Sequence, residues 1–331
     1  MEKIRIGING FGRIGRYVSR LILNSPDLEL VQVNDLSDIE TCAHLLKYDS
    51  VHGKLNKTVE IKDKSLICNS QTILFTSQKD IQSLNWKAQN VDIVIECTGI
   101  FRTQKDCEVH LRNGARKVII SAPASDGLVK TVCIGINDSI ITEEDRIISN
   151  ASCTTNSAAP LVKILHDLAE IESCYITTVH SYTSDQRLHD AAHKDLRRAR
   201  AAAESIVPTT TGAAKAITKI FPDLENKMGG CGIRVPVPDG SLTDMTFIVK
   251  NEISVEQINQ AFKKASEGDL KGILRYETDP IVSIDIIGDP NSCIFDSQLT
   301  SVIGNMIKVV GWYDNESGYS NRIIDLIRKI G

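Results

Sequence analysis

Residues 4–15 read IRIGINGFGRIG, an apolar run followed at once by three glycines in the pattern G-x-G-x-x-G. The run 4–8 predicts a buried parallel strand, the pattern over 16–23 predicts a helix, and 28–33 predicts a second strand. An acidic residue, Asp35, lies twenty residues beyond the last glycine. Glycines between a strand and a helix, with an acid after the next strand, are typical of a dinucleotide-binding turn. The first part of the chain is therefore expected to bind a dinucleotide.

Each residue of this pattern has its own task in such a turn. Gly10 permits the tight turn, Gly12 lets the backbone approach a pyrophosphate, and Gly15 allows the helix to pack closely on the strand. Asp35 can accept hydrogen bonds from the hydroxyls of the adenosine ribose. The alternative is a glycine-rich turn that binds nothing.

Further strands are expected over 91–97, 117–121 and 131–136, with helical pieces such as 106–113 between them. Strands that alternate with helices indicate a doubly wound parallel sheet, which is a Rossmann-type α/β domain. Ligands of such sheets bind at the carboxyl ends of the strands. We expect this domain to span residues 1–150.

The second half of the chain has a different pattern, with longer strands and few helices. Two helices are predicted, over 254–266, with Ser254 as N-cap and Gln257 three residues later, and over 317–330. The expected strands are 174–180, 231–235, 242–249, 282–286, 292–296 and 306–313. This pattern predicts an α+β domain with a mixed or antiparallel sheet.

Residues 149–156 read SNASCTTN and place Cys153 where an apolar strand turns into a helix. The free N–H groups and the dipole of a helix N-terminus favour an anion, so a thiolate is expected there. The same N–H groups could hold an oxyanion or a phosphate. The alternative is that serine, threonine and asparagine merely cap the helix and the cysteine is a small buried apolar residue.

His180 closes the predicted strand 175–180 and is a candidate base for Cys153, although a histidine at a strand end is more often structural. A polar stretch, 181–205, follows it and contains a basic run. Arginine, threonine hydroxyls and a glycine backbone suit phosphate groups, and such residues stand at 209–212 and at Arg234. The alternatives for the basic run are a solvated face or contact with nucleic acid.

Composition limits the classes of function. The net charge of −4 over 331 residues argues against a general nucleic-acid binder. The nine cysteines are odd in number and form no C-x-x-C pair, which indicates reduced thiols in the cytoplasm and neither a disulfide framework nor a metal site. The longest apolar runs are too short to cross a membrane.

The order of these motifs resembles phosphorylating glyceraldehyde-3-phosphate dehydrogenase of the bacterial type. The resemblance covers essentially the whole chain, and five stretches carry it: 9–16, 149–156, 193–200, 208–216 and 312–316. It implies a Rossmann domain over 1–150, a catalytic domain over 151–314, and a C-terminal helix, 315–331, that returns to the first domain. It also implies a homotetramer.

The resemblance assigns roles to single residues. Cys153 matches the nucleophile and His180 its activating partner. The positions that match the site for inorganic phosphate are Ser152, Thr154, Thr211 and Gly212. The positions that match the site for the substrate phosphate or another anion are Thr183, Arg198 and Arg234. The positions that match cofactor contacts, beside Gly10, Gly12, Gly15 and Asp35, are Arg13, Ile14, Lys79, Ser121, Asn315 and Tyr319.

The implied reaction oxidises D-glyceraldehyde 3-phosphate with NAD and transfers the acyl group from Cys153 to inorganic phosphate. This chain departs from many relatives by Ser157 in place of a second cysteine, by the sequence VPVPDGS over 235–241, and by Ala191-Ala192 in place of Leu-Pro. The last change leaves room for NADP, but Asp35 favours NAD, so weaker use of NADP is expected. The rival functions are an erythrose-4-phosphate dehydrogenase and a dinucleotide-binding protein with a non-catalytic role.

Overall fold

The computed structural model describes residues 2–331, which form two compact units. The first unit contains the chain up to Ile134, Asp138–Ala151 and Ser320–Gly331, and the second contains Gly135–Asn137 and Ser152–Tyr319. Within residues 2–331, no helix has the length and apolar character needed to cross a membrane.

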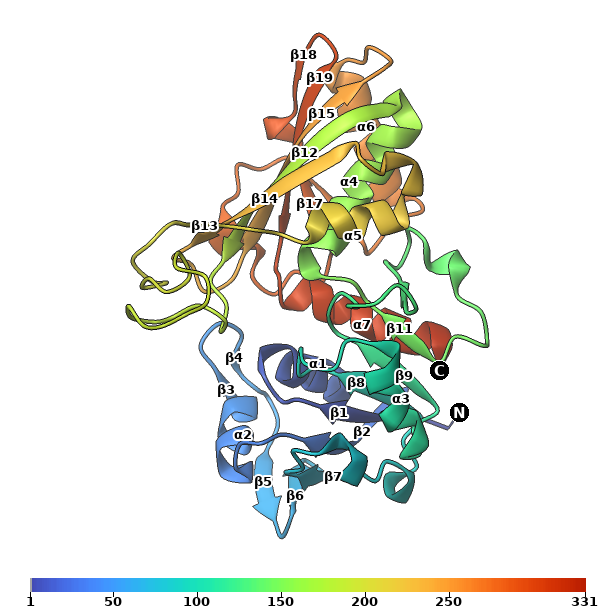
Figure 1. Ribbon diagram of the computed structural model, residues 1–331, viewed down its shortest axis with the longest axis vertical. Helices are drawn as coiled ribbons and strands as arrows, with labels where there is room; N and C mark the ends of the chain where they lie inside the picture. Colours follow the sequence, from blue (N-terminus) through green and yellow to red (C-terminus); the bar gives the residue numbers. More distant parts are fainter. Residues whose placement is uncertain (1) are drawn as a thin grey trace. The chain divides into compact units, whose positions relative to one another are not determined.

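The first unit is built on a nine-stranded sheet in the order β10-β11-β9-β8-β1-β2-β7-β6-β5 (Figure 1). Its strands are β1 (Ile4–Asn9), β2 (Leu28–Asn34), β5 (Val59–Lys62), β6 (Ser65–Cys68), β7 (Gln71–Thr76), β8 (Ile93–Glu96), β9 (Lys117–Ile120), β10 (Lys130–Thr131) and β11 (Ile147–Ser149). All neighbours are parallel except for the pairs that involve β5 and β6. Apolar residues fill both faces, because helices cover a parallel sheet on both sides.

Strand order explains where a ligand can bind. From β1 the chain steps to β2 through α1 (Arg13–Asn24), and from β8 it steps the opposite way to β9 through α3 (Gln104–Arg112). Right-handed crossovers then place the two helices on opposite faces, and the carboxyl ends of β1 and β8 form the switch point. Gly10 follows β1 with a φ of +95°, and a Cβ there would lie 2.7 Å from the Thr98 nitrogen. Only glycine fits this turn.

The last helix, α7 (Ser317–Ile330), completes the first unit with its residues from Ser320 onward. Ile323, Leu326 and Ile327 are fully buried, which is the apolar stripe of an amphipathic helix. The Lys117 ammonium donates to the carbonyl oxygen of Ile330 (2.7 Å), next to the helix end. The prediction of a helix over 317–330 is therefore confirmed.

Two features of the first unit differ from the sequence predictions. The meander β5–β6–β7 was not among the predicted strands. The strand predicted over 131–136 is wrong beyond Thr131, because the chain turns at Gly135, whose φ is +79°. The remaining elements are α2 (Ile39–Lys47) and the small hairpin β3 (Tyr48–Asp49) and β4 (Gly53–Lys54).

The second unit has a mixed sheet in the order β13-β14-β12-β15-β19-β17-β16, with β18 paired to β19. Its strands are β12 (Ile171–Ser181), β13 (Val207–Thr209), β14 (Met228–Val235), β15 (Ser241–Val249), β16 (Leu274–Glu277), β17 (Cys293–Asp296), β18 (Ser301–Ile303) and β19 (Met306–Tyr313). The helices α4 (Cys153–Ala169), α5 (Ala213–Ile220) and α6 (Val255–Glu267) pack on this sheet (Figure 1). A Rossmann-type sheet followed by a mixed sheet confirms the predicted fold class.

Two further predictions in the second unit had opposite outcomes. Ser254 caps α6 and forms a capping box with Gln257, as expected. The strand predicted over 282–286 is wrong, because Ser283–Ile286 is a short 3₁₀ helix. The Val282 N–H donates to the Asp285 carboxylate (2.8 Å), and this local bond closes a turn instead of joining a sheet.

Candidate active site

The first turn of α4 carries the residue around which the site is built. Cys153 is the first residue of the helix, and the hydroxyl of its N-cap, Ser152, accepts a hydrogen bond from the Thr155 N–H (3.1 Å). Ala151, the residue before Ser152, has a φ of +56°, which is uncommon for a residue with a side chain. The Asn156 amide donates to the Ser152 carbonyl oxygen (3.0 Å). These contacts hold the turn that presents Cys153.

His180 lies beside this cysteine, although 27 positions separate them in the sequence. It stands next to the end of β12, and its Nε2 lies 3.5 Å from the Cys153 sulfur. His180 is 6% exposed, so water reaches it poorly. The structure thus brings together the two residues for which the sequence predicted covalent chemistry.

Arg234 reaches the other nitrogen of the same imidazole. The strands β12 and β14 are parallel neighbours, and His180 stands opposite Arg234 in their register. The Arg234 Nη1 lies 2.5 Å from His180 Nδ1 and also donates to the Ser181 carbonyl oxygen (3.0 Å). That carbonyl oxygen lies 2.8 Å from His180 Nδ1. The imidazole is therefore held on both sides, by sulfur and by a guanidinium.

Burial controls the charges of this pair. Burial raises the pKa of the Cys153 thiol, and the opposing effects of the Arg234 charge and of hydrogen bonds to Thr154 are smaller. Burial and the Arg234 charge lower the pKa of His180 to about 3. Burial therefore opposes the thiolate that is expected at the helix N-terminus, whereas the Arg234 charge and the contacts with Thr154 favour it.

Tyr313, at the end of β19, was not singled out from the sequence. Its hydroxyl lies 2.9 Å from the Thr154 hydroxyl and 2.9 Å from the Thr178 hydroxyl, so it joins α4 to β12. Its ring meets the His180 ring edge-on at 6.0 Å between centroids. Burial raises the pKa of this phenol, which therefore stays protonated and acts as a neutral hydrogen-bonding bridge.

A carboxylate organises two of the predicted anion-binding residues. The Thr183 hydroxyl donates to Asp185, and the Arg198 Nη1 donates to the other Asp185 oxygen (2.5 Å). Two further nitrogens of Arg198 donate to the Thr209 hydroxyl (2.9 and 2.8 Å). Hydrogen bonds from Thr183 and the charges of Arg234 and Arg198 hold the pKa of Asp185 low, against the effect of its burial. In the free protein, Asp185 thus takes the donors that an external anion would need.

The other predicted phosphate positions lie at helix starts. Ser152 and Thr154 belong to the start of α4, and Gly212 is the N-cap of α5. Gly212 has no side chain to cap that helix, and a Cβ there would meet no atom within 4 Å. The Thr211 hydroxyl accepts from the Ala213 N–H (3.2 Å). Backbone N–H groups at a helix N-terminus suit an anion.

The glycine turn of the first unit has the features that a dinucleotide requires. A Cβ on Gly15 would lie 2.2 Å from the Gly10 carbonyl oxygen, so only glycine lets α1 start here. Gly12 is the N-cap of α1 without a side chain, and a Cβ there would meet open space. The Asp35 carboxylate accepts from the Phe11 N–H (2.6 Å) and the Ser37 N–H (2.9 Å), which fixes it at the carboxyl edge of the sheet.

The remaining predicted cofactor positions are divided between the units. In the first unit, Arg13 pairs with Asp49 (2.9 Å), Lys79 is exposed, and the Ser121 hydroxyl donates to the Glu96 carbonyl oxygen (3.0 Å). Ile14 is half-buried at the start of α1. In the second unit, the Asn315 Oδ1 accepts from the Ser181 and Ser241 hydroxyls (2.9 and 2.6 Å), and Tyr319 is buried.

Comparison with known proteins decides the family. Residues 4–104 match the model of the glyceraldehyde 3-phosphate dehydrogenase NAD binding domain, and 152–315 match that of its C-terminal domain. Glyceraldehyde-3-phosphate dehydrogenase 2 of Streptomyces avermitilis is 52% identical over 331 residues, covering 99% of this chain and 98% of that protein. The enzymes of Priestia megaterium (99% and 98% covered) and Geobacillus stearothermophilus (98% and 97%) are each 51% identical.

The chain belongs to the glyceraldehyde-3-phosphate dehydrogenase family. It is an NAD-dependent oxidoreductase of that family, and the predicted family, function and cofactor are confirmed. The glyceraldehyde-3-phosphate dehydrogenase model for the C-terminal domain covers Cys153, His180 and Arg234, and the NAD binding model covers the glycine turn and Asp35.

The sequence analysis did not predict a series of hydrogen bonds between buried polar side chains in the NAD binding domain. The Trp86 indole N–H donates to His110 Nδ1 (3.1 Å), and His110 Nε2 lies 3.1 Å from Glu96 Oε2. The Asn9 amide donates to the same Glu96 oxygen (2.6 Å), and the Asn34 amide donates to Asn9 (2.9 Å). All five side chains are at most 4% exposed. The chain of bonds ends beside Asp35, so it supports the edge of the sheet that faces the cofactor in this family.

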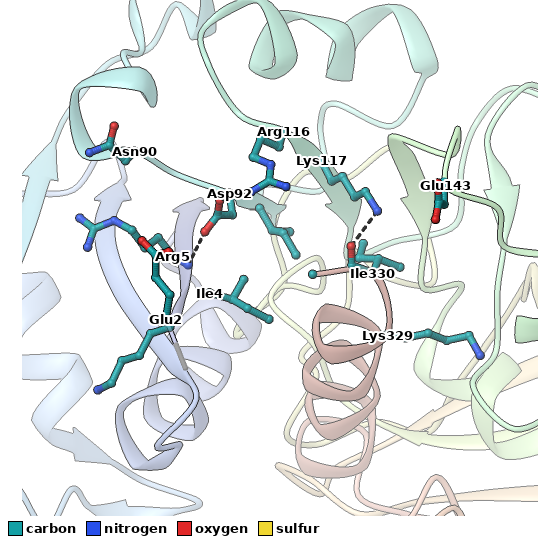
Figure 2. A pocket seen from close by; sticks show the side chains of 13 residues that line it. Glu2, Ile4, Arg5, Asn90, Asp92, Arg116, Lys117, Glu143, Lys329 and Ile330 are labelled. Carbon is teal, nitrogen blue, oxygen red and sulfur yellow. Dashed lines mark hydrogen bonds and ion pairs between the residues drawn. The ribbon is translucent and has the colours of Figure 1, made fainter.

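Figure 2 shows a cavity of about 630 Å³ at the opposite edge of the same sheet. The amino ends of β1 and β9 and the end of α7 line it, whereas the glycine turn follows the carboxyl end of β1. Four of its cationic side chains already have partners, in the pairs Arg5–Glu29, Arg116–Asp92, Lys329–Asp138 and Lys117–Ile330 oxygen. This cavity is therefore not the dinucleotide site of the family.

Proposed function

We propose that this protein oxidises D-glyceraldehyde 3-phosphate and phosphorylates the product to 1,3-bisphosphoglycerate. One observation carries the proposal: the Cys153 sulfur lies 3.5 Å from His180 Nε2 at the N-terminus of α4, within the family's C-terminal domain. A thiol beside an imidazole and a helix N-terminus suits covalent catalysis on a carbonyl carbon.

The proposed chemistry proceeds through sulfur. The Cys153 sulfur forms a bond to the aldehyde carbon and gives a hemithioacetal, and the thiol proton passes through His180 to the carbonyl oxygen. His180 then takes the hydroxyl proton as the carbon loses hydride, which leaves a thioester. NAD, when bound, would supply the acceptor for that hydride. A phosphate oxygen then bonds to the acyl carbon, and the carbon–sulfur bond breaks as the sulfur leaves as a thiolate. The thiolate takes back the proton from His180, and the proton of the phosphate passes to solvent.

The anion-binding residues divide into two groups in this proposal. Thr183, Arg198 and Arg234 would hold the phosphate of the substrate, because they offer charged and hydroxyl donors around one carboxylate, Asp185. The starts of α4 and α5 would hold the inorganic phosphate, with Ser152, Thr154, Thr211 and Gly212.

The glycine turn fits NAD. The uncapped start of α1 at Gly12 suits the pyrophosphate, and Asp35 suits the ribose hydroxyls. Its carboxylate would repel a 2′-phosphate, so NADP would be used more weakly. The further cofactor contacts that we propose are Gly10, Arg13, Ile14, Gly15, Lys79, Ser121, Asn315 and Tyr319.

We also propose a homotetramer, in which exposed apolar residues of the second sheet contact neighbouring copies. Tyr175 is 51% exposed and Ile303 is 68% exposed, although both lie on strands. All nine cysteines are free thiols, which supports a place in the cytoplasm. As functional domains we propose 1–150 for cofactor binding, 151–314 for catalysis, and 315–331 as the returning helix.

The test is the formation of NADH from glyceraldehyde 3-phosphate, with and without inorganic phosphate. We expect turnover that depends on phosphate, and much slower turnover with erythrose 4-phosphate. Turnover that ignores phosphate would favour an enzyme that releases a free acid. The absence of turnover with either aldehyde would contradict the proposal.

A further inference from the structure

The last residues of four neighbouring strands in the first unit carry polar side chains that form one row. Glu96 ends β8, Asn9 ends β1 and Asn34 ends β2. Thr76 ends β7, the next strand of the sheet. The four strands are parallel, and their register places these residues opposite one another in that order. The row therefore crosses the carboxyl edge of the sheet, where the glycine turn begins.

Hydrogen bonds run along this row in one direction, toward Glu96. The Gln78 N–H donates to Asn34 Oδ1 (2.8 Å), and the Gln78 carbonyl oxygen accepts from Asn34 Nδ2 (3.0 Å). The backbone after β7 thus fixes the orientation of the Asn34 amide. This amide also donates to Asn9 Oδ1 (2.9 Å), and the Asn9 amide donates to Glu96 Oε2 (2.6 Å). An Asn9 amide turned over would place a donor against the Asn34 donor.

Further donors reach Glu96 from α3 and from the turn after β8. The Trp86 indole N–H can only donate, so His110 Nδ1 is its acceptor (3.1 Å). The proton of the neutral ring then lies on Nε2, 3.1 Å from Glu96 Oε2. The Thr98 N–H (2.8 Å) and the Thr98 hydroxyl donate to Glu96 Oε1. Among residues 2–331, Glu96 thus accepts from four donor groups, which suits an ionised carboxylate.

We propose that Glu96 is a positioning residue that holds the turns after β8, β1, β2 and β7 in the arrangement that binds NAD. The inference rests on the proposed place of NAD at the glycine turn. Asn9 directly precedes Gly10, and Asn34 directly precedes Asp35. A buried polar network whose members all have partners makes its surroundings rigid. The free protein therefore has these turns already in place, and NAD does not have to order them.

The charge of Glu96 and its positioning role predict opposite effects on NAD binding. The pyrophosphate gives NAD a net negative charge, so removing a negative charge from this unit would strengthen binding if charge alone acted. Glu96→Gln removes the charge and keeps the size of the side chain. Its NH₂ group meets a donor in either orientation, at Asn9 and His110 or at Thr98. The turns are then displaced and must be ordered on binding, which weakens it.

The test separates NAD binding from catalysis. Isothermal titration calorimetry without aldehyde gives the Kd for NAD, and formation of NADH gives kcat and both KM values. We expect Glu96→Gln to raise the Kd and the KM for NAD about tenfold or more, which corresponds to ~1.4 kcal/mol. The kcat at saturating NAD and the KM for glyceraldehyde 3-phosphate should stay within about threefold of wild type. An unchanged or lower Kd, even with reduced stability in urea, or a loss confined to kcat overturns the proposal.

Glu108→Gln is the matched control. It makes the same exchange on α3, where the Glu108 side chain is 42% exposed and contacts Gln104 and Arg112. Because exposed ion pairs contribute little, the Kd for NAD should stay within about twofold of wild type. If Glu108→Gln changes the Kd as much as Glu96→Gln, a general effect of charge is responsible and the proposal fails.

Two variants of Thr98 keep the proposal testable if Glu96→Gln does not fold. Thr98→Ser keeps the hydroxyl that donates to Glu96, and its Kd for NAD should stay within about twofold of wild type. Thr98→Val keeps the shape but loses this bond and the one from the Ile100 N–H, so its Kd should rise about threefold or more. Equal Kd values for the two variants overturn the proposal.

The wild type separates this inference from the proposed function. If the wild type forms NADH but Glu96→Gln binds NAD as tightly, this inference is wrong and the proposed function stands. If Glu96→Gln weakens NAD binding as expected, but the wild type forms no NADH from glyceraldehyde 3-phosphate and phosphate, the proposed function alone is wrong.

Discussion

The buried chain Trp86–His110–Glu96 allows a prediction about the stability of the first unit. His110→Leu replaces the imidazole by an apolar side chain of similar size, so packing changes little. The fully buried Trp86 N–H then loses its acceptor, and the Glu96 carboxylate loses one of its donors. Neither the Trp86 nitrogen nor the Glu96 oxygen can form a hydrogen bond with water instead, because both residues are buried.

The magnitude follows from these two losses. An unsatisfied buried donor costs ~1–3 kcal/mol, and a hydrogen bond to a charged group contributes ~1.5–3 kcal/mol. Glu96 keeps the bonds from Asn9 and Thr98, which prevents a larger penalty. We therefore expect His110→Leu to lower the free energy of unfolding by about 3–5 kcal/mol. In a Trp86→Phe background the same substitution should cost ~1–2 kcal/mol less, because the donor is already gone.

Urea unfolding followed by far-UV circular dichroism measures these effects, with all variants at one protein concentration. His44→Leu is the matched control: it makes the same exchange on the exposed face of α2 and should change stability by less than ~0.5 kcal/mol. A loss below ~1 kcal/mol for His110→Leu, or strictly additive effects with Trp86→Phe, would refute the reasoning.

Three further predictions concern the site, the second unit and the cofactor. Cys153→Ser should reduce kcat by more than ~100-fold in the NADH assay, because a serine hydroxyl is far less acidic than a thiol and a poorer leaving group. Asp239→Asn should stabilise the protein increasingly as pH rises from 4 to 9, by at most ~1.4 kcal/mol per pH unit in thermal or urea unfolding, since burial and the charge of Asp314 raise the pKa of Asp239 to about 9. NAD should exceed NADP by ~10-fold or more in kcat/KM, because the Asp35 charge repels a 2′-phosphate despite the small Ala191.

Each of these has an outcome that contradicts it. A serine variant with near-normal kcat would remove Cys153 from the role of nucleophile. The sign for Asp239 follows from a folded pKa above the ordinary value of 3.8: the wild type loses stability as pH rises toward 9, and below 3.8 the two proteins should show the same difference at every pH. Unfolding curves whose difference does not change with pH would exclude a protonated Asp239. Equal kcat/KM for both cofactors would show that room at Ala191 outweighs the Asp35 charge.

Local signals in the sequence predicted the parts of the fold that depend on neighbouring residues. The turn at Gly10 follows from glycines between a strand and a helix, and the start of α6 follows from Ser254 and Gln257 alone. The wrong strand predictions at 131–136 and 282–286 also have local causes, but the apolar residues of both segments favour a strand more clearly than these causes oppose it. The backbone turns at Gly135 in the first segment. In the second, one hydrogen bond from the Val282 N–H to Asp285 closes a helical turn.

The site shows the limit of motif reasoning. Cys153 and His180 each stand at the end of a predicted element, so their approach could be anticipated. Asp185 and Tyr313 belong to no pattern, because their partners stand elsewhere in the sequence: Arg198 for Asp185, and Thr154 and Thr178 for Tyr313. The effect of burial on the pKa of the Cys153 thiol also could not be predicted, because burial depends on residues that are distant in the sequence.

The return of residues 320–331 to the first unit determines when that unit can be completed during synthesis. A ribosome finishes residue 151 long before it reaches residue 320, and at ~5–20 residues per second the 168 intervening residues take about 8–34 s. During that interval the surface that Ile323, Leu326 and Ile327 will cover has no helix on it. The helix that closes the earliest-made sheet therefore leaves the ribosome only after the whole second unit, and a chain that lacks this helix would present that apolar surface permanently.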